Sequence, residues 1–302
     1  MSILNFFKSK KIIVTHDGNF HADEIFAIAT LSLVHDGRIK ILRTRETHVL
    51  ASADYVLDVG QIYNPKIGAY DHHQLGGAGK RENGIEYATF GLIWKDFGSL
   101  ICGSDEVAKI IDERLVQPID ANDNGQEIVT PLIKNISPYR IQSIIGTRLP
   151  SWREYGKINV NREFKNLVAF AKDILVREIE KTKDNKIAEE RVLKEYSRSQ
   201  DKKIIILNEN YPFEEVLVQF PEPLFVVSPR PDGTWRVATI PIQKGSFTLR
   251  KTLPSHWAGL KDEAIRTVTH IDGALFCHRA LFLAVAKDKE SAIKMALLAL
   301  KS

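Results

Sequence analysis

The chain has 302 residues, 44% of them hydrophobic and 26% charged, which is the balance of a globular protein with one large or two ordinary domains. The formal charge of +4 and the pI of about 8.9 permit an anionic ligand, but they lack the large basic excess of a dedicated duplex-binding protein. Two cysteines exclude a disulfide framework and no apolar run approaches the roughly 20 residues that span a bilayer, so we expect a cytoplasmic protein without a membrane partner.

In residues 1–160, short apolar runs alternate with helical patterns. The runs "KKIIVT", "RIKILRTR" and "DYVLDVG" predict strands. Apolar residues recur at helical spacing from Ala22 to Leu33, and "GIEYATFGLIWKDFG" and "DEVAKIIDERLVQ" predict two more helices. Strands that alternate with helices predict a mainly parallel α/β sheet.

Residues 161–200 carry a long polar helical pattern, which "EKTKDNK" interrupts. This pattern fits a connector between domains or a helical hairpin. In residues 201–302, "KKIIIL", "LFVVSP", "TWRVATIPI" and "CHRALFLAVA" predict strands, and "DKESAIKMALLALK" predicts a closing helix. The second half therefore indicates a smaller α+β domain of ordinary size.

The stretch from His16 to Glu24 crowds ionisable residues between two apolar runs. Ligands of open α/β sheets bind beyond the carboxyl ends of the strands, and His16, His21 and Asp23 are spaced to converge on a divalent metal there. Asp17 and Glu24 are better explained as supporting groups or as acids that cap the next helix. Taken by itself, the stretch supports a capped helix and a metal-binding loop equally well.

Three further motifs carry acids or histidines. Asp58 ends an apolar strand, where a turn-forming acid is also common. Asp71 precedes the doublet His72–His73, and it is placed to fix a histidine tautomer. "PIDANDNG", which contains Asp120 and Asp123, favours a turn over a site when read alone.

Together these motifs resemble, in order, the metal motifs of the DHH phosphoesterase superfamily. More narrowly, "THDGNFHADE", "DVG", "YDHHQ", "GIEYATFGLIWKDFG", "PIDANDNG" and "GALFCHR" resemble the melanocyte proliferating gene family, which is described both as metal-dependent protein hydrolases and as RNA 3′–5′ exonucleases. The resemblance extends from Ile12 to the C-terminus. His21 stands where the wider superfamily usually has an aspartate.

The resemblance implies two divalent ions, each held by several residues at defined positions. His16, His21 and Asp58 would hold one ion. The second would be held by Asp58, which bridges, and by Asp23, His72 and one of Asp120 and Asp123. His73, supported by Asp71, would face the scissile phosphate. Imidazole and carboxylate ligands without thiolate fit Mn²⁺ best.

The resemblance also assigns a substrate-binding role to the C-terminal domain, with five candidate residues: Arg250, Lys251, His270, His278 and Arg279. Arg140, Arg148 and Arg153 are further candidates. The leading hypothesis is a two-metal phosphodiesterase that acts on RNA or short oligonucleotides, in the manner of a 3′–5′ exonuclease. A hydrolase of small phosphoanhydrides or nucleotides and a metal-stabilised binding protein remain alternatives, and a homo-oligomer is compatible with the sequence.

Overall fold

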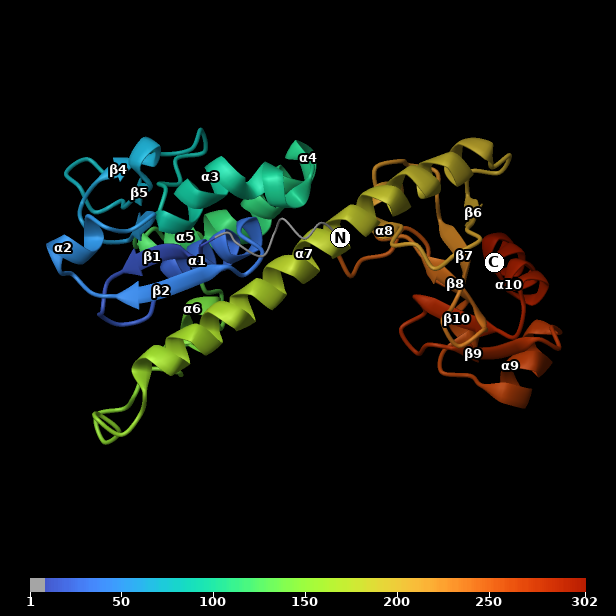
Figure 1. Cartoon of the computed structure of the whole chain (residues 1–302). Helices are drawn as coiled ribbons and strands as arrows, with labels where there is room; N and C mark the ends of the chain where they lie inside the picture. The colour runs from blue at the N-terminus through green and yellow to red at the C-terminus, as the bar shows by residue number, and fades with distance from the viewer. Residues whose placement is uncertain (1–8) are drawn as a thin grey trace. The chain divides into compact units, whose positions relative to one another are not determined.

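The computed structural model describes residues 9–302, and the chain divides into two compact units between Thr182 and Lys183 (Figure 1). The N-terminal unit holds a mainly parallel sheet, and the C-terminal unit is a smaller α+β unit. The fold class expected from the sequence is thereby confirmed. The division falls inside helix α7, Val160–Arg198, which is one continuous helix and not a helical hairpin.

The sheet of the N-terminal unit has the strand order β2-β1-β3-β5-β4. Strands β2, β1, β3 and β5 run parallel, and β4 pairs with β5 in the antiparallel sense. Their bounds are β1 Lys11–Thr15, β2 Ile39–Arg43, β3 Tyr55–Leu57, β4 Tyr63–Asn64 and β5 Ala69–Tyr70. The carboxyl ends of β1, β3 and β5 therefore lie side by side at one edge of the sheet.

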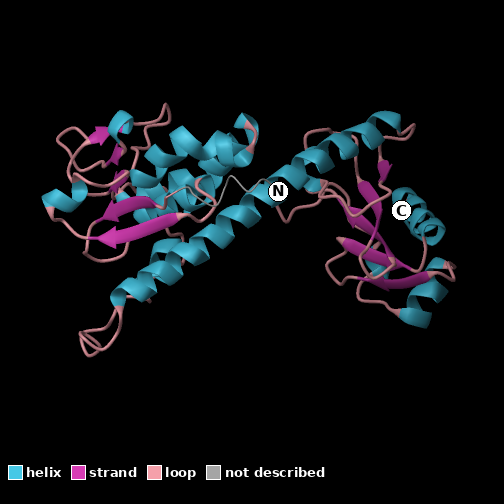
Figure 2. Cartoon of the chain, in the orientation of Figure 1, coloured by secondary structure: helices cyan, strands magenta, loops and turns pink. Residues whose placement is uncertain are grey.

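Helices cover this sheet (Figure 2). Their bounds are α1 Ala22–Val34, α2 Thr47–Leu50, η2 Pro65–Ile67, α3 Thr89–Cys102, α4 Asp105–Ile111, η3 Asp112–Val116, α5 Gln117–Asp123 and α6 Ile141–Gly146. Helix α1 packs against α3, and both bury apolar residues in one core, among them Phe26 and Phe90. Helix α1 is almost completely buried. Its burial fixes the preceding loop, residues 16–21, against the sheet edge.

Two local predictions for this unit need correction. The helix expected from Gly84 begins only at Thr89, because the preceding residues form a loop stabilised by hydrogen bonds such as Arg81 N to Ile85 O. The turn expected at "PIDANDNG" is largely helix α5, which places Asp120 and Asp123 on a helix. Pro118 follows η3, a π-helical turn that runs directly into α5, and such a turn interrupts the regular hydrogen-bond ladder that proline cannot join.

Helix α7 contributes to both cores. Phe164, Leu167, Ala171 and Leu175 are buried in the core of the N-terminal unit, and Val192 is buried in that of the C-terminal unit. The spacing of three or four residues is that of one helical face. No helix of the described residues is long and apolar enough to cross a membrane.

The C-terminal unit has a second sheet of order β6-β7-β8-β10-β9, in which β6 and β7 are parallel and the other pairs are antiparallel. Its elements are β6 Ile204–Ile206, α8 Glu214–Leu217, β7 Phe225–Pro229, β8 Trp235–Thr239, η4 Ser255–Trp257, α9 Asp262–Thr269, β9 Ala274–Cys277, β10 Leu283–Ala286 and α10 Lys289–Lys301. The single strand expected at "CHRALFLAVA" is wrong: a turn at residues 278–282 separates β9 from β10, and Leu281 there has a positive φ of 60°.

Candidate metal centre

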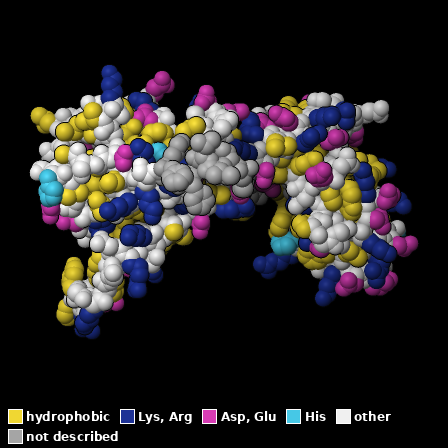
Figure 3. Space-filling view, in the orientation of Figure 1, with side chains coloured by type: hydrophobic (Ala, Val, Ile, Leu, Met, Phe, Trp, Pro, Cys, Tyr) yellow, Lys and Arg dark blue, Asp and Glu magenta, His cyan; other side chains and the backbone are white. Residues whose placement is uncertain are grey.

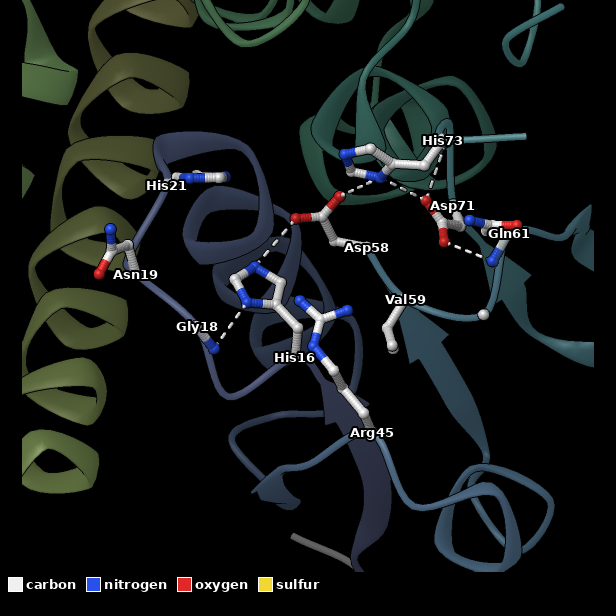
Figure 4. Close-up of a pocket in the computed structure, with 11 residues that line it drawn as sticks. His16, Gly18, Asn19, His21, Arg45, Asp58, Val59, Gln61, Asp71 and His73 are labelled. Carbon is white, nitrogen blue, oxygen red and sulfur yellow. Dashed lines mark hydrogen bonds and ion pairs between the residues drawn. The ribbon is translucent and has the colours of Figure 1, made fainter. Parts of the chain in front are cut away.

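Side chains that follow three parallel strands meet at one edge of the N-terminal sheet. His16 follows β1, Asp58 follows β3, and Asp71 follows β5. His73 joins them from the same loop as Asp71 (Figure 4). The chain order of the motifs thus becomes a spatial cluster, because parallel strands place their carboxyl ends together.

Asp58 lies between the histidines of this cluster. Its Oδ2 atom is 3.1 Å from His16 Nε2, and its Oδ1 atom is 3.3 Å from His72 Nε2 and 3.4 Å from His73 Nδ1. The residue is 2% exposed, and its φ of 55° lies in the left-handed region that aspartate tolerates better than most residues. Burial raises the pKa of Asp58, but contacts with His16 and His72 outweigh it and hold the pKa below its usual range. Each oxygen of this ionised carboxylate faces a different histidine, which is the arrangement of a bridging group.

His72 is oriented by the residue that follows helix α5. Its Nδ1 atom lies 3.1 Å from Asn124 Oδ1, and the Asn124 amide nitrogen donates to the carbonyl of Asp120. The Asn124 oxygen can only accept, so His72 carries a proton on Nδ1 and turns Nε2 toward Asp58 and Asp123, at 3.3 and 3.1 Å. Burial lowers the pKa of His72, but hydrogen bonds with these two carboxylates raise it to about 10.

His16 has the opposite tautomer. The Gly18 amide donates to His16 Nδ1 at 3.1 Å, so the proton of the neutral ring is on Nε2 and faces Asp58. A cation bound at Nε2 would require the ring proton to move to Nδ1, and the Gly18 amide could then no longer donate to that atom. A side chain at Gly18 would crowd the ring, since its Cβ would lie 3.1 Å from Nδ1.

Three residues at the start of α1 and the end of α5 form the rest of the cluster. His21, Asp23 and Asp123 each offer one ligand atom, and these atoms lie within 4.8 Å of one another. His16, His21, Glu24 and Asp58 form a second such group, and Asp58, His72 and His73 form a third. His21 and Asp58 each belong to two groups.

The cluster has unpaired buried atoms and excess negative charge. Among the described residues, both oxygens of Asp23 and Nδ1 of His21 are buried without a hydrogen-bond partner. Burial raises the pKa of Asp23 well above its usual range, and the charges of Asp58 and Asp123 raise it further. A divalent cation removes both penalties, so the residues present fit a metal.

Glu24 is fully buried, and its carboxylate contacts both the start of α1 and His16. Its carboxylate accepts the backbone N–H of His21 at 2.9 Å, which caps α1 as expected from the sequence, and its Oε1 lies 3.6 Å from His16 Nε2. Asp17 instead is exposed and lies 3.4 Å from the Arg45 Nε atom. Neither was a predicted ligand, and only Glu24 lies in the cluster.

Of the two aspartates on α5, Asp123 lies in the cluster and Asp120 does not. Asp120 accepts from the Gly91 amide at 2.9 Å and pairs with Arg81 at 2.8 Å, and Arg81 also pairs with Asp112. Burial raises the pKa of Asp120 to about 7 despite Arg81. Because this aspartate is committed to the ion pair, we assign the candidate ligand role to Asp123.

Asp71 orients His73. One oxygen of Asp71 accepts from His73 Nδ1 at 2.8 Å, and the other accepts from the Gln61 amide at 2.6 Å. Asp71 is 1% exposed, whereas half of the His73 side chain is exposed. Nδ1 therefore carries a proton, and Nε2 of His73 is left for chemistry in the pocket.

A pocket of about 360 Å³ opens over this cluster. Its lining residues are His16, Gly18, Asn19, His21, Arg45, Asp58, Val59, Gly60, Gln61, Asp71 and His73. Arg45, which follows β2, is the permanent cation among these described residues, and its guanidinium lies beside His16 in Figure 4. Sequence reasoning missed Arg45, although its place just past a parallel strand was a usable signal.

The five substrate-binding candidates of the C-terminal unit have different surroundings: some contact backbone atoms and others are exposed. Arg250 donates to the backbone carbonyls of the segment after α8, at 2.6 Å for Val218, and Lys251 donates to the carbonyl of Leu300 at 3.0 Å. His278 Nδ1 accepts an N–H from the turn backbone. His270 and Arg279 are exposed. The basic groups of Arg250 and Lys251 thus contact their own unit, and a substrate role for all five residues stays a prediction.

The fold and the cluster define a class: an α/β protein with a candidate metal centre at the carboxyl ends of parallel strands. The family model MYG1_exonuc, described as an uncharacterised protein family (UPF0160), matches residues 12–300. The chain therefore belongs to the MYG1 family, and the narrower resemblance found in the sequence is confirmed.

Relatives match along nearly the whole chain. The MYG1 protein of Saccharomyces cerevisiae is 28% identical over 97% of this chain and 96% of its own. The human MYG1 exonuclease is 29% identical over 94% and 84%, and the MYG1 protein of Chlamydia pneumoniae is 31% identical over 92% and 93%. Among solved structures, an exopolyphosphatase-related protein from Bacteroides fragilis covers 99% of this chain and 94% of its own at 12% identity, but its TM-score of 0.23 carries no argument.

Proposed function

We propose that the chain is a metal-dependent hydrolase that cleaves phosphodiester bonds of RNA or short oligonucleotides. The observation that carries this proposal is the buried Asp58 carboxylate, whose two oxygens face His16 on one side and His72 on the other. This is the arrangement that a carboxylate shared by two ions requires. Mammalian relatives named MYG1 exonuclease support a nucleic-acid substrate.

The proposed ligands divide into two sets that share Asp58. His16 and His21 complete one set, and His72, Asp23 and Asp123 complete the other. Divalent ions held by these two sets would supply Lewis acidity and a nucleophile at neutral pH. The mixture of imidazole and carboxylate favours Mn²⁺ over Mg²⁺.

The remaining side chains of the pocket position the substrate and move a proton. Asp71 holds the ring proton of His73 on Nδ1, so Nε2 is the proton acceptor, which would take a proton from the attacking water and could then pass it to the leaving oxygen. Arg45 offers the charged fork that binds a phosphate oxygen. A single permanent cation suits a phosphodiester, which carries one negative charge, better than a chain of phosphoanhydrides.

The direct test is incubation of the metal-free protein, restored with Mn²⁺, with end-labelled single-stranded RNA. We expect nucleotide release by the wild type, a loss of at least about a thousandfold in Asp58→Ala because one ligand of both ions is removed, and full activity in the control Asp36→Asn, whose carboxylate pairs with Arg38 on the surface. Equal release by Asp58→Ala overturns the proposal. Release of phosphate from pyrophosphate alone selects the phosphoanhydride alternative, and a metal-dependent melting shift without any hydrolysis selects the binding protein.

A further inference from the structure

The loop between α6 and α7, residues 147–159 and here called the tip loop, carries two exposed aromatic residues. Trp152 is 76% exposed and Tyr155 is 70% exposed. The Arg153 guanidinium lies over the Trp152 ring, 4.8 Å from its centroid. Figure 3 shows hydrophobic and basic side chains together at this end of the N-terminal unit. Large aromatic residues exposed beside a cation are typical of a binding surface.

The helices on both sides of the tip loop are linked to residues 16–21, here called the metal loop. Before it, the Gln142 side chain of α6 donates to the carbonyl of Phe20 at 3.1 Å. After it, Arg43 links the start of α7 to the metal loop: its guanidinium donates to the carbonyl of Gly18 at 2.5 Å and lies 4.7 Å from the Phe164 ring centroid. The helices from which the tip loop extends are therefore held against the loop that carries His21.

The charge around the two rings complements a polyanion. Residues 140–157 hold four basic residues and one acidic residue, Glu154. The Glu154 carboxylate accepts the backbone N–H of Ser151 at 2.9 Å, which turns it to the loop's own backbone. Arg140 and Arg148 pair with Glu127 and Glu163, so the charge offered to a polyanion is that of Arg153, which lies over the Trp152 ring, and of Lys157.

We propose that Trp152, Arg153 and Tyr155 form a stacking platform for the bases of a single-stranded nucleic acid whose scissile phosphate lies at the metal centre. Bases stack on aromatic rings whatever their identity, and arginine adds a cation–π contribution. The inference rests on the proposed function and narrows its substrate to oligomers, because a mononucleotide or pyrophosphate held in the pocket has no neighbouring base to stack.

A nucleic acid explains this surface better than a protein partner does. The tip loop alternates aromatic and charged residues, whereas the neighbouring segment exposes aliphatic residues such as Leu132, Ile133 and Ile136. Protein interfaces also use aromatic residues and arginine, so the choice of a nucleic acid rests on the excess of basic over acidic residues here, which complements a polyanion.

The test measures binding of fluorescein-labelled oligouridylates to the full chain in EDTA, by anisotropy. We expect Trp152→Ala and Tyr155→Ala each to weaken binding of an octamer by about 5- to 100-fold and to leave binding of a dinucleotide unchanged. Trp152→Phe keeps a ring and should retain most of the affinity. Leu132→Ala removes an apolar side chain that is still more exposed, at 98%, and should match the wild type. Equal melting temperatures show that all variants fold.

Restoring Mn²⁺ separates this inference from the function on which it rests. If the wild type cleaves RNA while Trp152→Ala and Tyr155→Ala bind and cleave the octamer as the wild type does, the platform is overturned and the function stands. If the octamer binds through Trp152 but no substrate is cleaved, the platform stands and the function fails. Variants that lose self-association in sedimentation without losing RNA affinity assign the loop to a second copy of the chain and overturn the platform.

Discussion

The His72 ring is aimed by Asn124: its Nδ1 atom lies 3.1 Å from the Asn124 side-chain oxygen, and its Nε2 atom points at Asp58 and Asp123. An amide oxygen accepts only, so this contact selects the tautomer that leaves Nε2 ready to bind a cation. The metal centre thus depends on a residue that is not itself a proposed ligand.

Asn124→Ala should weaken Mn²⁺ binding by about 10- to 100-fold, because the His72 ring loses its orienting partner. Calorimetric titration of the metal-free protein measures this. Asn122→Ala removes an amide from helix α5 without touching His72, and it should bind the metal as the wild type does. Equal affinities for both variants would show that Asn124 only packs.

Asp23→Asn should stabilise the metal-free protein while it impairs metal binding. Burial and neighbouring carboxylates raise the pKa of Asp23, so its ionised form opposes folding at neutral pH when no cation is present. We expect a melting temperature in EDTA that is higher by about 2–4 °C, which corresponds to about 1 kcal/mol. The rise in melting temperature on adding Mn²⁺ should shrink in the variant, and a variant that melts lower in EDTA contradicts this reading.

The metal-free protein should lose stability as the pH rises from about 6.5 to about 10. The pKa of His72 is raised from 6.5 to about 10, so its protonation stabilises the fold fully below 6.5 and ceases to do so above 10. Melting temperatures in EDTA across this range measure the slope. His72→Gln removes the titrating group and should flatten it, so an unchanged slope in that variant would assign the effect to other groups.

Arg45→Gln should lower kcat/KM for RNA by about 10- to 100-fold through the loss of a charge-assisted hydrogen bond to phosphate. Metal affinity should stay at the wild-type value, because Arg45 faces the pocket beside the ligands and is not one of them. Arg38→Gln, which breaks only the surface pair with Asp36, is the matched control. If kcat/KM falls equally in both variants, the role of Arg45 is not specific.

The position of the cluster was predictable from the sequence, because acids and histidines after parallel strands must meet at one sheet edge. The choice between Asp120 and Asp123 was not. It depends on Arg81, which lies in a loop without periodicity, and on a helix that reads locally as a turn. The tautomers of His16 and His72 depend on Gly18 and Asn124, contacts that only packing creates.

In the C-terminal unit, the segments that form strands were predictable from β-branched runs, but the turn inside "CHRALFLAVA" was not. The apolar run continues through Leu281 and Phe282, while the backbone reverses direction there with a positive φ at Leu281. Arg250 was predicted to bind phosphate from its residue type, and this role stays a prediction. Its carbonyl contacts come from residues distant in the chain, which no local pattern reveals.

The central claim is a pair of ions that share Asp58, and anomalous scattering from crystals grown with Mn²⁺ tests it most directly. We expect two peaks within coordination distance of Asp58, one beside His16 and one beside His72, and no peaks there in Asp58→Ala. Peaks elsewhere in the chain, or none in the wild type at saturating Mn²⁺, would contradict the account.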